Sequence, residues 1–403
     1  MHLKVTASST FRASVTLPSS KSISNRVLMI KELMHADFRL SGLADCDDTK
    51  VLQSAFLSMK SNKTAELNLE GSGTAMRFLT AFAAMANGEF VLTGNKRMQE
   101  RPIAVLVDAL RELGADIQYL GNEGFPPLKI KGGNLKGRTL SIRGNVSSQY
   151  VSALLMIAPM LPEGLKLTFT TAITSRPYID LTMSIMRQFG AKVEWTADDA
   201  IAVAPVPYSF DNDEYCNEAD WTAASYWYSM FALSNDEARS LDFTNLPADS
   251  MQGDAIVPQL FRKMQNSAIF AFNFADNPDL VQTLAVCCCA LGKSFVFTGL
   301  DSLRIKETDR IHALQTELCK LGFDVKANDN VLTYGACRLC RTHDFEALTV
   351  DTYGDHRMAM AFAPLALVAP YIIIRDAEVV GKSYPTFWQD LSNAGFAIEP
   401  IAD

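Results

Sequence analysis

Long apolar segments are absent from this sequence. The longest one, residues 358–374, is shorter than the roughly 20 residues that cross a membrane as a helix, and it contains Pro364 and Pro370. We therefore expect no membrane partner, and we predict a buried helix followed by a strand over these residues. Histidine is also rare, with five in the chain. Only His356 lies in a charged cluster, and we interpret the other four as surface or capping residues.

An excess of positive charge is absent as well. The chain has 37 Lys and Arg residues against 45 Asp and Glu residues, a formal net charge of −8. This balance argues against a nucleic acid as the main partner. Apolar residues make up 48% and charged residues 20%, which is typical of a globular protein. The length of 403 residues suggests two or three domains at about 150 residues each.

The eight cysteines do not form a disulfide pattern, since three are consecutive in an apolar run, Cys287, Cys288 and Cys289. Buried thiols of this kind, together with an N-terminus that lacks an apolar signal core, indicate a reducing compartment and a cytoplasmic protein. The pair CRLC at residues 337–340, with His343 nearby, invites a zinc interpretation. Because no second tidy ligand pair accompanies it, we prefer a protein without a metal.

Two standard phosphate-binding motifs are missing. GKS occurs at Gly292 and at Gly381, but a P-loop needs another glycine five residues earlier, where this chain has Cys287 and Asp376. GSGTAM, which begins at Gly71, lacks the third glycine of a dinucleotide fingerprint. Phosphate recognition, if present, must use another arrangement.

An internal repeat runs through the chain. A short polar cluster, an apolar helix, a strand, an amphipathic helix and further strands recur at roughly 50 to 80 residues, a mixed α/β pattern. The clearest copies begin at Gly73, Ser147 and Asp355, and weaker ones begin near Ser22, Trp221 and Asp279. The first helix of each copy is apolar on most faces and is predicted to be buried. Six copies divide into two domains of three, and the polar tract 211–220 is the predicted hinge.

Polar and basic residues gather where the first helices begin. The clusters are KSISNR (21–26), GSGTAMR (71–77), SSQY (147–150), WTAAS (221–225), NPDL (277–280) and GDHR (354–357). A helix N-terminus attracts anions, although any single cluster is better explained as an N-terminal cap. Basic residues are not needed for capping, so their recurrence predicts a site for several anionic groups.

Further basic residues follow the same logic. Arg101 and Arg176 each precede a proline, Lys382 precedes a serine, and the segment RIKETDR spans residues 304–310. On a helix, Lys306 and Arg310 would share a face. A solvated, salt-bridged turn is the competing interpretation of that segment.

Eight segments along almost the whole chain carry a closer resemblance. They read PSSKSISNR, GTAMR, MQERPI, SSQY, SRPYID, KETDR, YGDHRMAM and GKSYPTF. Together they resemble the 5-enolpyruvylshikimate-3-phosphate (EPSP) synthase family. The resemblance implies two similar domains, each of three βαβαββ repeats around buried helices, an inverse α/β barrel-like fold. It assigns residues 1–15 and 217–403 to a C-terminal-type domain and 16–216 to an N-terminal-type domain, with hinges near 16–20 and 211–220.

The resemblance also implies a reaction. The family transfers the enolpyruvyl group of phosphoenolpyruvate to the 5-hydroxyl of shikimate 3-phosphate through a tetrahedral intermediate and releases phosphate, a step of the shikimate pathway. It implies no metal, no organic cofactor, a monomer whose domains close to exclude water, and glyphosate as an inhibitor at the phosphoenolpyruvate site.

Site residues follow from the same resemblance, motif by motif. Asp279 would accept the proton of the 5-hydroxyl, Glu307 would serve the methylene carbon, and Lys21 would touch both substrates. The residues implied for shikimate 3-phosphate are Lys21, Ser22, Arg26, Ser147, Ser148, Gln149, Ser175, Tyr178, Asp279 and Lys306. Those implied for phosphoenolpyruvate are Lys21, Gly73, Arg101, Gln149, Arg310, Arg357 and Lys382.

Two positions depart from the family pattern, Gly71 and Ser302, where the family commonly has asparagine, and both affect the expected geometry on the shikimate phosphate side. Two alternatives stay open. One is a UDP-N-acetylglucosamine enolpyruvyl transferase, which shares the fold, and the other is a catalytically silent phosphosugar-binding protein. The paired carboxylates Asp279 and Glu307 argue against the second, because a binder of anions has no use for them.

Overall fold

The computed structural model describes residues 1–8, 10–335 and 348–401. The chain forms two compact units. Unit 1 comprises Met1–Pro18 and Glu218–Asp403, and unit 2 comprises Ser19–Asn217. The motif CRLC and His343 lie outside the described residues, so the zinc interpretation is not addressed by the structure.

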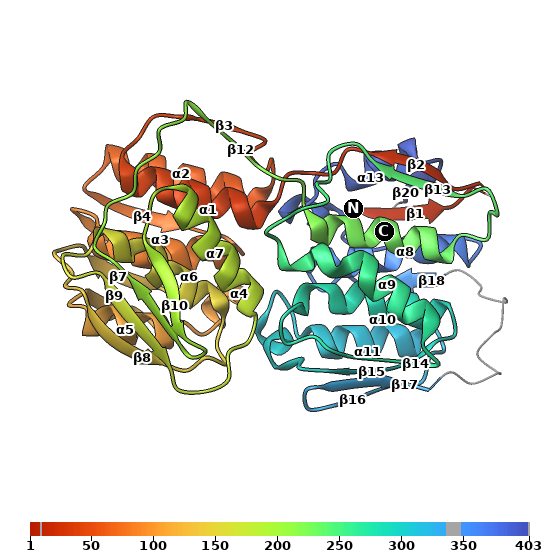
Figure 1. The fold of residues 1–403 in the computed structure, drawn as a ribbon. Coiled ribbons are helices and arrows are strands. Elements are labelled where there is room, and N and C mark those ends of the chain that lie inside the picture. Colours follow the sequence, from red (N-terminus) through yellow and green to blue (C-terminus); the bar gives the residue numbers. More distant parts are fainter. Residues whose placement is uncertain (9, 336–347, 402–403) are drawn as a thin grey trace. The chain divides into compact units, whose positions relative to one another are not determined.

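Unit 2 is built from helices surrounded by short-stranded sheets (Figure 1). Its helices are α1 (Lys21–Met34), α2 (Asp47–Ser61), α3 (Gly73–Met85), α4 (Lys96–Gln99), α5 (Ala104–Glu112), α6 (Ser148–Ile157) and α7 (Arg176–Gln188). Its strands are β3 (Arg39–Ser41), β4 (Thr64–Asn68), β5 (Glu89–Thr93), β6 (Asp116–Tyr119), β7 (Leu128–Lys131), β8 (Arg138–Ile142), β9 (Leu165–Phe169), β10 (Val193–Ala197), β11 (Ala200–Val203) and β12 (Glu214–Cys216).

Unit 1 repeats this composition. Its α-helices are α8 (Trp221–Leu233), α9 (Val257–Asn266), α10 (Val281–Ala290), α11 (Arg310–Lys320), α12 (His356–Phe362) and α13 (Phe387–Asn393). Its 3-10 helices include η2 (Gly253–Ile256), η3 (Pro278–Leu280), η4 (Asp301–Ile305), η6 (Ala363–Leu367) and η7 (Ala377–Lys382). Its strands are β1 (His2–Thr6), β2 (Arg12–Val15), β13 (Ser240–Phe243), β14 (Ile269–Asn273), β15 (Ser294–Thr298), β16 (Val325–Asn328), β17 (Val331–Tyr334), β18 (Leu348–Val350), β19 (Ile372–Ile374) and β20 (Ala397–Ile401).

Four sheets of the described chain share one pairing pattern. Their strand orders are β4-β5-β7-β6, β10-β11-β9-β8, β14-β15-β17-β16 and β18-β19-β1-β20. In each, a parallel pair is joined through a helix, and two antiparallel pairings follow. The connecting helices α3, α6, α10 and α12 are buried along nearly their whole length. The predicted α/β fold with repeats around buried helices is confirmed.

The sheet β18-β19-β1-β20 includes the first strand of the chain. β1 pairs antiparallel with β19 and with β20, so the red strand β1 lies among the blue strands of unit 1 in Figure 1. The repeat that ends the chain therefore takes one strand from its beginning.

The two remaining repeats exchange strands. β2, which precedes α1, pairs in parallel with β13, which follows α8, and both belong to unit 1. β3, which follows α1, pairs in parallel with β12, which precedes α8, and both belong to unit 2. The described parts of these repeats have two strands each instead of four, which accords with the weak pattern of the copies near Ser22 and Trp221, whereas the copy near Asp279, also weak in the sequence, has a four-stranded sheet.

The apolar segment 358–374 has the predicted structure. It forms α12, the 3-10 helix η6 and then β19, with the helical residues buried. In the described part of the chain no helix has both the length and the apolar composition that crossing a membrane requires.

Candidate active site

Arg310 is the centre of a dense ionic cluster in unit 1. Its guanidinium contacts three carboxylates, with Nε 2.7 Å from Asp355 Oδ2, Nη1 2.8 Å from Asp279 Oδ1 and Nη2 2.9 Å from Glu307 Oε2. The Arg310 side chain is 2% exposed and that of Asp355 is 0% exposed. Burial alone would lower the pKa of Arg310, but the charges of Asp355, Glu307 and Asp279 together outweigh it and raise that pKa. The guanidinium therefore holds three acidic side chains from separate segments in fixed positions.

Asp279 lies in η3 and is held by three cations. Arg310 and Arg357 contact its two oxygens at 2.8 and 2.9 Å, and Lys306 Nζ is 3.9 Å from Oδ1. Burial alone would raise the pKa of Asp279, but the charges of Arg357, Lys306 and Arg310 outweigh it and hold the pKa well below the usual range. Asp279 is therefore ionised at neutral pH and can accept a proton only from a group close to it.

Glu307 and Lys382 complete this cluster. Lys382 Nζ is 3.2 Å from Glu307 Oε1, while Arg310 contacts the other oxygen of the same carboxylate. Both side chains are only slightly exposed, at 14% and 13%. The six unit 1 residues predicted for the site are thus brought together in one network of charges.

Part of the sequence interpretation of residues 304–310 is wrong. Lys306 and Arg310 do not share a helix, because α11 begins at Arg310 with Asp309 as its cap, and Lys306 directly follows η4. They nevertheless face the same carboxylate, Asp279. The flanking ion pair of Arg304 with Asp309 at 3.1 Å is the exposed salt bridge that the competing interpretation expected.

At the start of α12, Asp355 is both an N-terminal cap and an ion-pair partner. Asp355 accepts a hydrogen bond from the Arg357 backbone N–H at 2.9 Å, which is an N-terminal cap, while its other oxygen binds Arg310. The Arg357 guanidinium donates to the Tyr226 hydroxyl at 3.2 Å and to Asp279. Asp355 and Tyr226 were not among the predicted site residues, although Asp355 lies inside the GDHR cluster that the sequence had singled out.

Unit 2 holds a second group of predicted residues around Arg26 of α1. The guanidinium donates to Thr182 Oγ1 at 2.7 Å, to the Ser22 carbonyl at 2.8 Å and to Ser152 Oγ at 3.1 Å. It also donates to the Tyr178 carbonyl at 3.3 Å. Arg26 is 3% exposed, and burial lowers its pKa to about 10. Arg26 thereby links α1 to α6 and α7 through neutral acceptors.

Lys21, the first residue of α1, pairs with Asp48 of α2. The distance between Nζ and Oδ2 is 2.9 Å, and both side chains are mostly buried. Asp48 is a residue that the sequence did not indicate. It lies in the first turn of α2, where an acidic residue is commonly explained by the helix dipole.

Gly73 and Arg101 meet at the start of α3. A Cβ on Gly73 would lie 2.8 Å from both terminal nitrogens of Arg101, so the glycine gives the guanidinium its room. Gln149 of α6 donates from Nε2 to Thr74 Oγ1 at 3.0 Å, which ties α6 to the same turn. Three residues predicted to bind phosphoenolpyruvate thus lie around one helix start.

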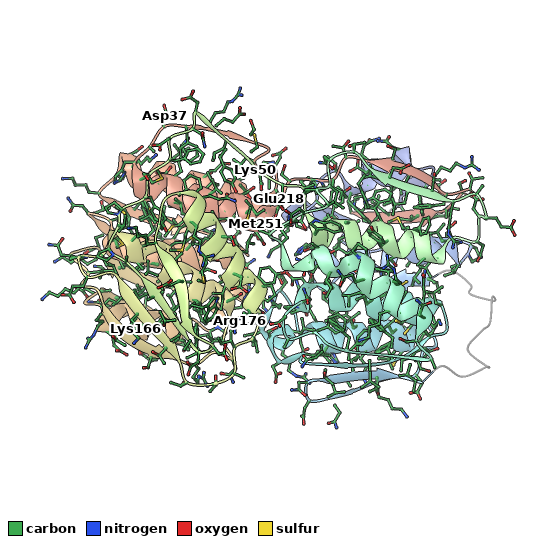
Figure 2. The ribbon with its side chains drawn as sticks, in the orientation of Figure 1. Asp37, Lys50, Lys166, Arg176, Glu218 and Met251 are labelled. Carbon is green, nitrogen blue, oxygen red and sulfur yellow. The ribbon has the colours of Figure 1, made fainter. Side chains whose placement is uncertain are left out.

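The serines at the starts of α6 and α7 behave differently from one another. Ser147 caps α6, since its Oγ accepts from the Gln149 backbone N–H at 3.3 Å, and Ser148 is the first residue of that helix. Ser175 precedes α7 with a left-handed φ of 56° and makes no capping hydrogen bond with its side chain. Arg176, labelled in Figure 2, lies with its guanidinium 4.0 Å from the centre of the Trp195 ring. Capping alone therefore accounts for Ser147 but not for Ser175.

Comparison with known proteins gives this geometry its context. The family model EPSP synthase (3-phosphoshikimate 1-carboxyvinyltransferase) matches residues 51–391. The chain belongs to the EPSP synthase family. It is 46% identical over 417 residues to the 3-phosphoshikimate 1-carboxyvinyltransferase of Bacteroides fragilis strain YCH46, with 99% of each chain covered. It is 35% identical over 415 residues to the enzyme of that name from Photobacterium damsela subsp. piscicida, with 94% of this chain and 95% of the relative covered.

Solved structures of the same fold include an EPSP synthase from Acinetobacter baumannii, with a TM-score of 0.73, 20% identity and full coverage of both chains. The enolpyruvyl transferase NikO from Streptomyces tendae has a TM-score of 0.75 and 16% identity, with 99% of this chain and 98% of that chain covered. At these identities the likeness concerns the fold. The EPSP synthase family assignment rests on the sequence matches.

Proposed function

We propose that this chain is a 3-phosphoshikimate 1-carboxyvinyltransferase. It transfers the enolpyruvyl group of phosphoenolpyruvate to the 5-hydroxyl of shikimate 3-phosphate and releases phosphate. The observation that carries this proposal is the arrangement of Asp279 and Glu307 on one guanidinium, that of Arg310, with Lys306, Arg357 and Lys382 around them. Membership of the EPSP synthase family supports it.

Shikimate 3-phosphate is bound by hydroxyl, amide and cationic groups. The guanidinium of Arg26 and the hydroxyls of Ser147, Ser148 and Ser175 suit a phosphate or a carboxylate. The other proposed ligands are Lys21, Ser22, Gln149, Tyr178, Lys306 and Asp279. Arg26 suits an anion because its buried charge is surrounded by neutral acceptors, which leaves it under-compensated.

Phosphoenolpyruvate is bound by a different set of cations. Arg101 beside Gly73 and the guanidiniums of Arg310 and Arg357 are planar forks that match a carboxylate or a phosphate. Lys21, Gln149 and Lys382 complete the set. Cations around the phosphate stabilise the negative charge that develops as it leaves.

Proton transfers at two carboxylates complete the scheme. As the 5-hydroxyl oxygen adds to C2 of phosphoenolpyruvate, the hydroxyl proton passes to Asp279 and the C3 methylene gains a proton from Glu307. The tetrahedral adduct then returns a proton from C3 to Glu307 and expels phosphate, which takes the proton held by Asp279, and the double bond is restored. Both residues are carboxylates held by fixed hydrogen bonds, as general acid–base catalysis requires.

Phosphate release separates this function from its alternatives. We expect phosphate release only when phosphoenolpyruvate and shikimate 3-phosphate are both present. Release with UDP-N-acetylglucosamine as the acceptor would instead assign the chain to the sister reaction. Binding of shikimate 3-phosphate by calorimetry, without phosphate release, would identify a silent binding protein.

The protein is proposed to act as a monomer in the cytoplasm. Cys287, Cys288 and Cys289 are buried thiols in α10, and burial raises the pKa of Cys287 to about 12. Thiols of this kind suit a reducing compartment. Light scattering at micromolar concentration tests the oligomeric state.

A further inference from the structure

Asp254 is a buried carboxylate of unit 1 that the proposed mechanism does not use. It lies in η2, and 3% of its surface is exposed. Thr222 Oγ1 donates to its Oδ2 at 2.6 Å, and Asn277 Nδ2 donates to its Oδ1 at 3.1 Å. Both donors are neutral, so this carboxylate receives weaker compensation from them than a cation would give.

The two donors connect Asp254 to the catalytic cluster. Asn277 is the residue before η3, which carries Asp279, and its Nδ2 also donates to the Gly253 carbonyl at 3.0 Å. The side chain of Asn277 therefore ties the η3 turn to the start of η2. Thr222 lies four residues before Tyr226 on α8, on the same face of the helix, and Tyr226 accepts a hydrogen bond from Arg357.

A charge at this position has an electrostatic cost. Burial, followed by the charge of Asp279, raises the pKa of Asp254 to about 6, although Thr222, Asn277 and Arg357 act in the opposite direction. A neutral asparagine could make the same two hydrogen bonds, because its oxygen can accept from Asn277 while its amide donates to the Thr222 hydroxyl. These two hydrogen bonds do not by themselves require an acid here.

We propose that Asp254 is a positioning residue for the transfer reaction. Its negative charge, held next to the Asn277–Asp279 turn, offsets the cations around Asp279 and keeps Asp279 basic enough to take the hydroxyl proton. Arg357, Arg310 and Lys306 all withdraw basicity from Asp279. A second buried negative charge opposes them, since like charges favour protonation of their neighbour. This inference rests on the proposed function, because it concerns the proton acceptor of that reaction.

The test is the ratio of wild-type kcat to that of Asp254→Asn, measured by phosphate release from pH 5 to pH 8.5. We expect a ratio on the order of ten at pH 8 that falls toward one at pH 5, with its midpoint near pH 6. Below that midpoint the wild-type carboxyl is protonated and resembles the amide. The phosphates of the substrates also titrate near pH 6, but they affect both proteins equally and cancel in the ratio.

The charged groups that act most strongly on Asp254 do not titrate in this range. They are Asp279 of η3 and Arg357 of α12, and Arg357 donates a hydrogen bond to the Tyr226 hydroxyl of α8. The pKa of Asp279 lies well below the usual range and that of Tyr226 is about 12, and a guanidinium stays charged. KM for both substrates should change less than about threefold, because the proposed role concerns proton transfer and not binding.

Asp236→Asn is the matched control. Asp236 follows the other end of α8 and also accepts from neutral donors, the backbone N–H groups of Phe11 and Ala238. Its ratio should stay near one at every pH. A ratio for Asp254→Asn that is large but independent of pH would mean a structural role and overturn the inference, and so would a ratio of one throughout.

A second variant, Thr222→Val, tests the proposal if Asp254→Asn does not fold. Thr222→Val keeps the charge but removes one hydrogen bond to the carboxylate, which raises the pH at which Asp254 becomes protonated. Its kcat should match the wild type at pH 8.5 and fall below it at pH 6 to 7, and equal activity across the range contradicts the proposal. Absence of phosphate release by the wild-type protein overturns the function and the inference together, whereas an active wild type with a flat ratio overturns the inference alone.

Discussion

The two units hold their cations in opposite ways. In unit 1, Arg310 contacts three carboxylates and Arg357 contacts a fourth oxygen of the same cluster. In unit 2, Arg26 is bound by hydroxyls and carbonyls, and within the described residues no carboxylate pairs with it. Arg310 and Arg26 are both almost fully buried.

Under the proposed function, this difference separates the carboxylates proposed to transfer protons from a cation proposed to bind an anion. Neutral acceptors leave a buried guanidinium with uncompensated charge, and the lowered pKa of Arg26 records that cost. Under the proposed function, the phosphate or carboxylate of the substrate relieves it. In unit 1 the charge of Arg310 is matched by carboxylates of the protein, and the network holds these carboxylates in fixed positions for the proposed proton transfers. The same residue type thus serves two purposes, according to whether its partners are charged.

The largest expected effect is on turnover in unit 1. Glu307→Gln removes the carboxylate proposed to serve the methylene carbon and should lower kcat at least a hundredfold, as for a general acid–base group. Asp279→Asn should do the same for the hydroxyl proton. Phosphate release measures both. Asp301→Asn is the control and should keep wild-type kcat, because Asp301 lies in η4 and its carboxylate accepts hydrogen bonds from the side chain of Asn330. Near-normal turnover of either site variant would remove that residue from the mechanism.

The next effect concerns stability and tests the comparison directly. Arg310→Met leaves three carboxylates without their shared partner and should lower the free energy of unfolding by about 3–5 kcal/mol, as expected when a buried ion pair loses one member. Arg26→Met leaves only neutral acceptors and should cost about 1–3 kcal/mol. Urea unfolding of the two variants, followed by circular dichroism, measures the difference. Equal losses would contradict the contrast drawn between the two units.

A smaller effect depends on pH and concerns Asp254. Its folded pKa of about 6 lies above its ordinary value near 3.9, so the folded state binds more protons between these values and stability falls as the pH rises through this range. Asp254→Asn removes that penalty. The variant should therefore be more stable than the wild type above pH 6, by on the order of 2 kcal/mol, and the gain should shrink as the pH falls toward 4. Thermal unfolding at pH 8 and pH 4 tests this, and a loss of stability at pH 8 would contradict it.

The smallest effect is on substrate use in unit 2. A Cβ in Gly73→Ala meets the flexible end of Arg101, so the guanidinium must shift, and KM for phosphoenolpyruvate should rise severalfold, which corresponds to about 1 kcal/mol. Inhibition by glyphosate, the longer anion, should weaken much more. Gly133→Ala is the control, because a Cβ there meets nothing within 4 Å. Steady-state inhibition by glyphosate, measured against phosphoenolpyruvate, tests this prediction. Full sensitivity of Gly73→Ala to glyphosate would contradict the proposed role of the Gly73 turn in binding phosphoenolpyruvate.

Much of the fold could be predicted from periodicity. The buried helices α3, α6 and α12 follow polar clusters and are apolar on most faces, which needs no knowledge of their neighbours. The exchange of β2 and β3 between the repeats could not be predicted in this way. Short strands of four and three residues carry little pattern, and their partners are more than 170 residues away along the chain.

The residues of the site also differ in whether the sequence could predict them. The clusters around Glu307 and Arg357 were recognisable because basic residues at helix starts are unusual, whereas the roles of Asp279 and Glu307 were implied only by the family resemblance. Asp48, Asp254 and Tyr226 carried no such signal, since an acidic residue in a first helical turn or an aromatic residue in an apolar helix has an ordinary explanation. Whether the cluster residues act in catalysis stays a prediction for the experiments above.

By itself the sequence determined which segments form helices, which faces are buried and where cations gather, because these depend on residues close together in the chain. Only the tertiary structure decided which carboxylate each cation meets. Arg310 binds Asp355, which lies 45 positions away in the sequence, while Arg26 binds Thr182, 156 positions away. Whether a buried guanidinium is balanced by acid or left with neutral acceptors is fixed by packing between distant helices, and no local pattern records it.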